Sequence, residues 1–231
     1  QHDPRMPIDT SPRNPPYLLC LSSPVFYVPS MRSLFCAALL SATVVFLTGC
    51  ASTSGVGRFH TVVLDAGHGG IDRGAKGVDG STEKKYALDT AKRVERGLKR
   101  AGYRVVMTRK GDYFITLPSR VAISNRQRGA IFVSIHYNWA SRSGASGTET
   151  YYYNSRSYPL AANIQRELAR FSGNRGVKRA RFHVLRNNLR PSALVECGFL
   201  SNSGDARKVR SSSHRQRLAD AIVRGIVKSS R

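Results

Sequence analysis

Two histidines follow apolar stretches of the chain at points where β-strands are expected to end. His68 lies in the glycine-rich loop after residues 61–65, and His136 closes the apolar stretch 130–136. Imidazole nitrogens are common metal ligands, and glycines let a backbone turn sharply beside a bound ion. Histidines in such places are also often plain turn or strand-end residues. The chemistry of these two therefore depends on partners elsewhere in the chain.

Two glutamates are the candidate partners. Glu83 falls in the first turn of a predicted helix, and Glu196 lies within the apolar stretch 193–197. An acidic residue in a first turn can simply favour the helix dipole. An unpaired carboxylate inside an apolar strand, in contrast, costs several kcal/mol. Ligand crevices of α/β sheets form outside the carboxyl ends of the strands, so we expect both histidines and both glutamates to converge there.

Two histidines and one carboxylate, with a fourth position for water, form the ligand set of a catalytic zinc site. Zinc lowers the pKa of bound water toward about 7 and polarises a substrate carbonyl. A further carboxylate would take the proton of that water and pass it to a leaving amine. The residue types thus predict one zinc ion and amide hydrolysis. Arg73 and Asn138 flank the expected crevice and either orient an acidic substrate or stabilise loops.

The elements that position these residues alternate short apolar strands with helix-length segments, which is typical of the α/β class. We expect one catalytic domain over residues 58–231, with no internal repeat and no separate binding module. The strands are expected at 61–65, 103–108, 130–136, 147–153, 182–185 and 193–197, and the helices at 82–100, 117–128, 160–171 and 214–228, with N-caps at Ser81 and Ser119.

The first part of the chain resembles a sorting signal. Residues 1–30 are rich in proline and polar residues; we predict them to be disordered and to lie upstream of the true start. Residues 31–49 combine a positive start, a short apolar run and small residues, as secretory signals do. The ending Leu-Thr-Gly-Cys resembles the lipobox of bacterial lipoproteins. It predicts lipidation of Cys50, a tether over residues 50–57, and a periplasmic protein anchored in the outer membrane.

The charge balance restricts the partners. The chain has 37 basic and 14 acidic residues, a formal charge of +23, and residues 1–49 contribute little of it. Such a surface attracts nucleic acid, anionic lipid or an acidic wall polymer. An exported protein does not meet nucleic acid, so we expect its partners to be anionic lipid or wall polymer. We also expect the protein to be a monomer. Cys197 would be the sole cysteine left unmodified. We expect its side chain to be a small buried group and not a nucleophile.

The motifs together resemble the zinc-dependent N-acetylmuramoyl-L-alanine amidases of the amidase_3 family. The resemblance implies a mixed six-stranded sheet flanked by helices, and hydrolysis of the amide that joins N-acetylmuramic acid to L-alanine in peptidoglycan. Residue by residue, it makes His68, Glu83 and His136 the zinc ligands and Glu196 the catalytic glutamate. The stretches that carry it are 64–70, 80–84, 134–138, 147–153, 174–178 and 194–202.

Division-associated members of that family carry an extra helix that blocks the zinc until an activator moves it. Between His136 and Glu196 this chain has 59 residues, which we expect to hold strands and one ordinary helix. This predicts an open site that needs no activator. Two alternatives remain open: a zinc peptidase acting on the stem peptide, and a non-catalytic wall-binding lipoprotein. The second would show a degraded ligand set, whereas all four residues are present here.

Overall fold

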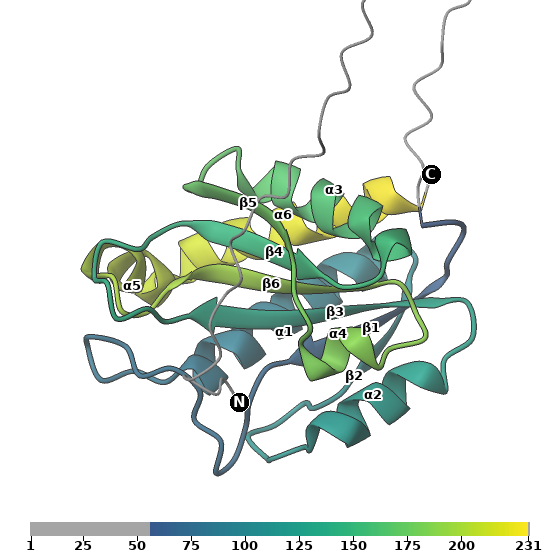
Figure 1. Ribbon diagram of the computed structural model, residues 1–231, viewed down its shortest axis with the longest axis horizontal. Helices are drawn as coiled ribbons and strands as arrows, with labels where there is room; N and C mark the ends of the chain where they lie inside the picture. Colours follow the sequence, from purple (N-terminus) through teal and green to yellow (C-terminus); the bar gives the residue numbers. More distant parts are fainter. Residues whose placement is uncertain (1–55, 231) are drawn as a thin grey trace, which may run out of the picture. The chain divides into compact units, whose positions relative to one another are not determined.

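A six-stranded mixed sheet forms the centre of the computed structural model, which describes residues 56–230 (Figure 1). The strand order is β2-β1-β3-β6-β4-β5. Strands β2, β1, β3 and β6 run parallel, β4 is antiparallel to β6, and β5 is parallel to β4. The carboxyl ends of four strands therefore meet at one edge. The strands are β1 (Thr61–Ala66), β2 (Arg104–Met107), β3 (Ala130–Asn138), β4 (Thr148–Tyr152), β5 (Asn174–Arg179) and β6 (Ser192–Phe199).

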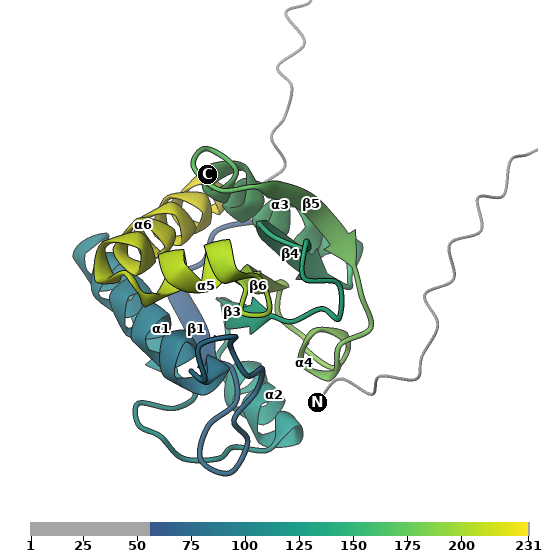
Figure 2. The ribbon, with the colours of Figure 1, turned by 90° about the vertical axis from the view of Figure 1, so that its left-hand side faces the viewer.

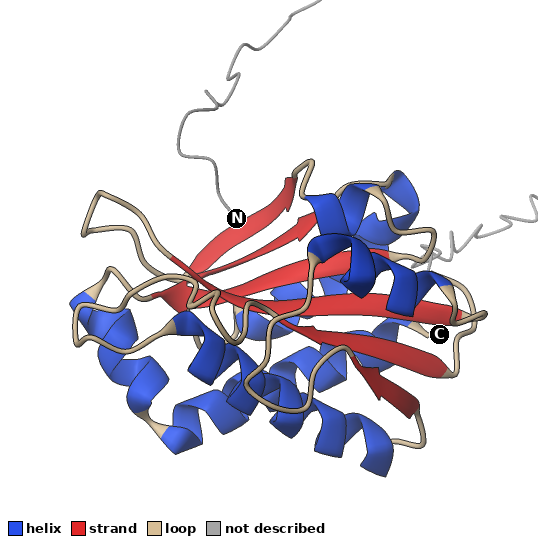
Figure 3. Cartoon of the chain, turned by 90° about the horizontal axis from the view of Figure 1, so that it is seen from below, coloured by secondary structure: helices blue, strands red, loops and turns tan. Residues whose placement is uncertain are grey.

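Helices cover both faces of this sheet (Figures 2 and 3). The helices are α1 (Glu83–Arg100), α2 (Leu117–Asn125), α3 (Tyr158–Leu168), α4 (His183–Arg186), α5 (Ser203–Arg210) and α6 (Ser212–Ser229), with a 3-10 turn η1 at Ser155–Ser157. Alternate residues of β3 pack against the helices on the two faces of the sheet, because successive side chains of a strand point to opposite faces. Val133 and Ile135 pack with α1, α3 and α6, whereas Phe132 packs with α2 and α4. The central strand is thus buried on both sides.

The mixed six-stranded sheet and the α/β class agree with the prediction, but one predicted strand is wrong. Residues 182–185 lead into helix α4 and form no strand. Val184 and Leu185 are adjacent and pack in the same apolar cluster, which one helical turn allows, whereas successive side chains of a strand point to opposite faces. The sixth strand is β5, which has a single large apolar residue, Val177, and lies at the edge of the sheet. Helix α5 is a further element absent from the prediction.

Both predicted N-caps are wrong, although a threonine close by takes each position. Helix α1 begins after Thr82, and the Ser81 hydroxyl hydrogen-bonds to Asp79 instead. Helix α2 begins after Thr116, whose hydroxyl accepts a hydrogen bond from the backbone N–H of Ser119 at 3.3 Å. The Thr82 side chain makes no capping hydrogen bond, so α1 begins without a side-chain cap. Serine and threonine have similar capping chemistry, so the sequence alone does not choose between Thr116 and Ser119 for α2.

The predicted leader over residues 31–49, the lipidation site Cys50 and the preceding residues 1–30 lie outside the described part of the chain. Within residues 56–230, no helix combines the length and the apolar character that crossing a bilayer requires.

Candidate metal centre

Three of the four predicted residues meet at the carboxyl edge of the sheet. One ligand atom from each of His68, Glu83 and His136 lies within 4.8 Å of the other two. Glu83 lies between the histidines: its Oε2 is 2.9 Å from Nε2 of His68, and its Oε1 is 2.8 Å from Nδ1 of His136. A loop after β1, the first turn of α1 and the end of β3 supply the three side chains.

Backbone groups fix the Glu83 carboxylate in this position. It accepts hydrogen bonds from the N–H groups of Ala75, at 2.9 Å, and Tyr137, at 3.0 Å. Burial alone would raise the pKa of Glu83, but its contacts with His136 and His68 hold the pKa far below its ordinary value. Glu83 is thus a buried anion, the form in which a carboxyl group binds a metal ion.

His68 has a second acidic neighbour on its other side. Its Nδ1 lies 2.9 Å from Oδ1 of Asp72, which leaves Nε2 directed toward Glu83. Burial would lower the pKa of His68, but Glu83 and Asp72 together raise it. A carboxylate on the far nitrogen commonly orients a metal-binding imidazole. Asp72 is therefore a supporting residue, and its loop position gave no sign of this role in the sequence.

The His68 loop has an unusual backbone. His68 has a φ of 59°, in the left-handed region that residues other than glycine rarely adopt. A Cβ added at Gly67 would lie 2.5 Å from Nε2 of His136, so this position has no room for a side chain. The loop and the end of β3 are therefore packed directly against each other.

Two buried arginines hold that loop. Arg120 donates hydrogen bonds to the carbonyls of Ala66 and His68, at 2.7 and 2.6 Å. Arg109 donates to the carbonyls of Ala66 and Gly67, at 2.9 and 2.7 Å. Arg120 also contacts Asp65 at 2.7 Å. Neither arginine is among the predicted site residues, because only the assembled sheet shows that they are buried.

Glu196 lies beside this cluster within the sheet. Its register partners are His136 on β3 and Glu149 on β4. It is 4% exposed, and its buried Oε2 has no hydrogen-bond partner among the described residues. Burial raises the pKa of Glu196 well above its ordinary value, and the charges of Glu83 and Glu149 add to this effect. Such a carboxyl group suits proton transfer.

Glu149 is a further buried glutamate beside Glu196, and it is absent from the predicted site residues. Its Oε1 accepts hydrogen bonds from Asn138 and from the Tyr151 hydroxyl, at 2.8 and 2.6 Å. Its Oε2 contacts Arg175 at 2.8 Å and Lys178 at 2.5 Å. Burial would raise the pKa of Glu149, but these donors lower it. A glutamate between two threonines in a predicted strand was the available signal.

The two predicted substrate contacts differ in their surroundings. Asn138 already uses both ends of its amide, with Nδ2 donating to Glu149 and Oδ1 accepting from the backbone N–H of Trp139. Arg73 is exposed, and its carbonyl accepts a hydrogen bond from the N–H of Lys84. Asn138 thus links β3 to the Glu149 network, while the Arg73 side chain extends from the surface of the loop.

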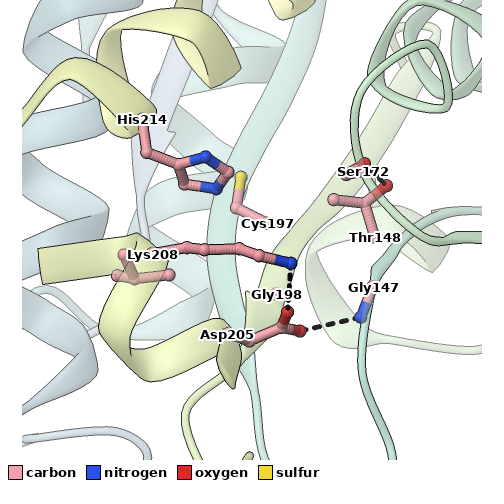
Figure 4. Close-up of a pocket in the computed structure, with 9 residues that line it drawn as sticks. Gly147, Thr148, Ser172, Cys197, Gly198, Asp205, Lys208 and His214 are labelled. Carbon is pink, nitrogen blue, oxygen red and sulfur yellow. Dashed lines mark hydrogen bonds and ion pairs between the residues drawn. The ribbon is translucent and has the colours of Figure 1, made fainter. Parts of the chain in front are cut away.

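Cys197 is free and buried, as expected. Burial raises the pKa of its thiol well above the ordinary value, which keeps it protonated and unreactive. It lines a small pocket together with His214 (Figure 4). In that pocket the Asp205 carboxylate accepts a hydrogen bond from the N–H of Gly147 at 2.7 Å and lies 3.7 Å from Nζ of Lys208. The bond to Gly147 joins α5 to the start of β4.

Known proteins have sequences similar to that of this chain. A Bacillus subtilis protein named YqiI, described as uncharacterized, is 41% identical over 202 residues, which cover 85% of this chain and 97% of the relative. The N-acetylmuramoyl-L-alanine amidase LytC of the same organism is 39% identical over 173 residues. That alignment covers 72% of this chain and 35% of LytC, so the chain spans about a third of that relative.

Solved structures agree with these relatives. The N-acetylmuramoyl-L-alanine amidase AmiC2 of Nostoc punctiforme has a TM-score of 0.71 and 41% identity, and the match covers 73% of this chain and 95% of AmiC2. The catalytic domain of the amidase CwlV from Bacillus (Paenibacillus) polymyxa has the same TM-score and 36% identity, with 74% and 97% covered. The model of the Amidase_3 family, described as N-acetylmuramoyl-L-alanine amidase, matches residues 62–228. On the combined evidence of fold, sequence and family match, this chain belongs to the Amidase_3 family of N-acetylmuramoyl-L-alanine amidases.

Proposed function

We propose that this protein is a zinc-dependent peptidoglycan hydrolase that cleaves the amide between N-acetylmuramic acid and the L-alanine of the stem peptide. The observation that carries this proposal is the meeting of His68, Glu83 and His136 next to Glu196, whose buried Oε2 has no partner in the described structure. The names of the relatives, which include amidases of the cell wall, support the same substrate.

The donor set fits zinc. Two imidazoles and one buried carboxylate are typical protein ligands of a catalytic zinc ion, which keeps a further position for water or substrate. The Asp72 carboxylate behind His68 supplies the supporting contact that such sites commonly have. When bound, zinc would lower the pKa of water and polarise the substrate carbonyl.

In this proposal Glu196 moves the proton. It takes a proton from the attacking water, whose oxygen bonds to the lactyl carbonyl carbon. It then gives the proton to the L-alanine nitrogen as the carbon–nitrogen bond breaks. His68, Glu83 and His136 hold the metal, and Asp72 orients His68. The products are a free lactyl carboxyl group and a peptide with a free amino terminus.

Zinc stoichiometry combined with mass spectrometry of the digestion products tests the proposal. The expected result is one zinc per chain, and products cleaved between muramic acid and an intact stem peptide. Shortened peptides would favour a zinc peptidase, and the absence of any product would favour a non-catalytic wall-binding protein. Either result would overturn the proposed function.

We also propose that the site acts without an activator. The chain between His136 and Glu196 forms β4, η1, α3, β5 and α4, so it contains the short helix α4 and the 3-10 turn η1 besides the one helix that the sequence predicts. We expect the purified protein to digest isolated sacculi by itself. Strict dependence on an added protein factor would contradict this expectation.

For location, we propose export and attachment of a monomer to the outer membrane through lipid on Cys50, with the basic surface facing anionic lipid or wall polymer. The lipobox-like ending of residues 47–50 supports this. The intact mass of the protein extracted from membranes tests it, because cleavage before Cys50 and lipid addition both change the mass. An uncleaved chain without lipid would refute it.

A further inference from the structure

A groove runs along the exposed side of helix α1, with one end at the loop that carries His68. It is open, has a volume of about 380 Å³, and is lined by Thr82, Lys84, Lys85, Leu88, Asp89, Lys92 and Asp112. Its near end is joined to the His68 loop, because Lys84 Nζ donates a hydrogen bond to the carbonyl of Gly70 at 2.8 Å. Asp112 accepts a hydrogen bond from the N–H of the same glycine, also at 2.8 Å.

The acidic groups of this groove are already paired. Asp112 forms an ion pair with Lys84 at 2.7 Å. Asp89 forms ion pairs with Arg93 and Arg215, at 2.8 and 2.5 Å. The charge of each aspartate is therefore compensated by at least one cation within 2.8 Å.

Two lysines of the groove remain without an acidic partner among the described residues. Lys85 and Lys92 are exposed and lie seven residues apart, on one side of α1. At a rise of 1.5 Å per residue their positions are about 10 Å apart along the helix axis. Three residues of an extended peptide span about the same distance. Arg73, exposed in the loop before α1, adds a third cation near the metal centre.

We propose that this groove binds the carboxylates of the stem peptide, with Lys85 and Lys92 as the contacts. This inference rests on the proposed function, which places an acidic peptide on the leaving side of the cleaved amide. The complementarity is one of charge and spacing. Two cations without an acidic partner face solvent along a groove whose near end is hydrogen-bonded to Gly70, in the loop that carries His68. The lysines thus determine which stem peptides the enzyme prefers.

The experiment compares a muropeptide with free stem carboxylates with the same muropeptide whose carboxylates are amidated. For the zinc-loaded protein we expect a KM about tenfold lower on the free-acid form, since two exposed charge pairs contribute about threefold each. In the double variant Lys85→Gln, Lys92→Gln this preference in KM disappears. High salt, about 0.5 M, should reduce the preference of the wild type.

The matched control is Arg126→Gln, Arg128→Gln. It removes two exposed charges at the other end of β3 from His136, and it should keep the preference. A preference that survives in the lysine variant, or disappears equally in the control, overturns the inference. Binding of the free stem peptide, measured by calorimetry, separates this result from failure of the proposed function. If no muropeptide is cleaved but the peptide binds through the lysines, the inference about the groove is supported and the proposed activity is refuted.

Discussion

Glu149 and Glu196 stand directly opposite each other in the antiparallel pair of β4 and β6. Two like charges in such a pair repel each other, and here the two carboxyl groups have different surroundings. Arg175 and Lys178 lower the pKa of Glu149, whereas burial and the neighbouring anions raise that of Glu196. The sheet thus separates a permanently charged glutamate from one that can exchange a proton.

This relationship predicts the effect of Glu149→Gln. Loss of the Glu149 charge leaves Arg175 and Lys178 beside Glu196, so the pKa of Glu196 falls. Because a general base acts when deprotonated, the acidic limb of the kcat/KM profile should move to lower pH. The control is Glu95→Gln, at an ion pair on the outside of α1. An unchanged profile would contradict this role of Glu149.

Replacement of Glu196 should separate proton transfer from metal binding. We expect Glu196→Gln to retain zinc and to lose about 10³-fold in kcat, within the range for general acid–base catalysis. His68→Ala should lose zinc as well as activity. Metal analysis beside steady-state kinetics gives both quantities. Near-normal turnover of Glu196→Gln would show that another group is the base.

The contact between Gly67 and His136 can be tested without removing any ligand. A Cβ in Gly67→Ala would lie 2.5 Å from Nε2 of His136, so the ring must move. We expect zinc affinity to fall by about 10- to 100-fold, as when a supporting contact is lost. Gly144→Ala is the control, because a Cβ there meets nothing within 4 Å. Equal zinc affinity in the two variants would show that the loop adapts.

The buried pair of Asp65 and Arg120 predicts acid sensitivity. Burial would raise the pKa of Asp65, but Arg120, Thr108 and Ser134 together hold it below the ordinary value of 3.8. A carboxyl group with a depressed folded-state pKa stabilises the fold above its unfolded pKa, and this stability is lost as pH falls from about 3.8 through the folded-state value. Asp65→Asn should lower the free energy of unfolding at pH 7 by about 3–5 kcal/mol.

Denaturant titrations at pH 7 and near pH 3 check this prediction. The difference in the free energy of unfolding between the wild type and Asp65→Asn should be smaller at the lower pH. Near pH 3, Asp65 is largely protonated in the unfolded chain, so part of the stability from its charge is lost. A difference that is the same at both values would mean that the variant loses packing and not the charge interaction.

The sequence predicts the members of the metal centre because each stands at the end of an element with a clear pattern. Five strands and the long helices follow from apolar periodicity, which is local. The supporting groups cannot be predicted from local periodicity, because Arg120 and Asp65 are 55 residues apart and only the assembled sheet buries them together. Strand β5 is absent from the prediction for a related reason: an edge strand with polar side chains has no apolar alternation.

The loop that carries His68 is held in place by other parts of the protein, and this bears on how a metal ion would be acquired. The carbonyl groups of that loop are held by Arg109 and Arg120, and no metal takes part in these bonds. The loss of chain entropy on ordering the loop therefore accompanies folding and not metal uptake. If the site binds zinc as proposed, we expect the protein to take up and release the ion without unfolding, unlike small domains that fold only around their metal.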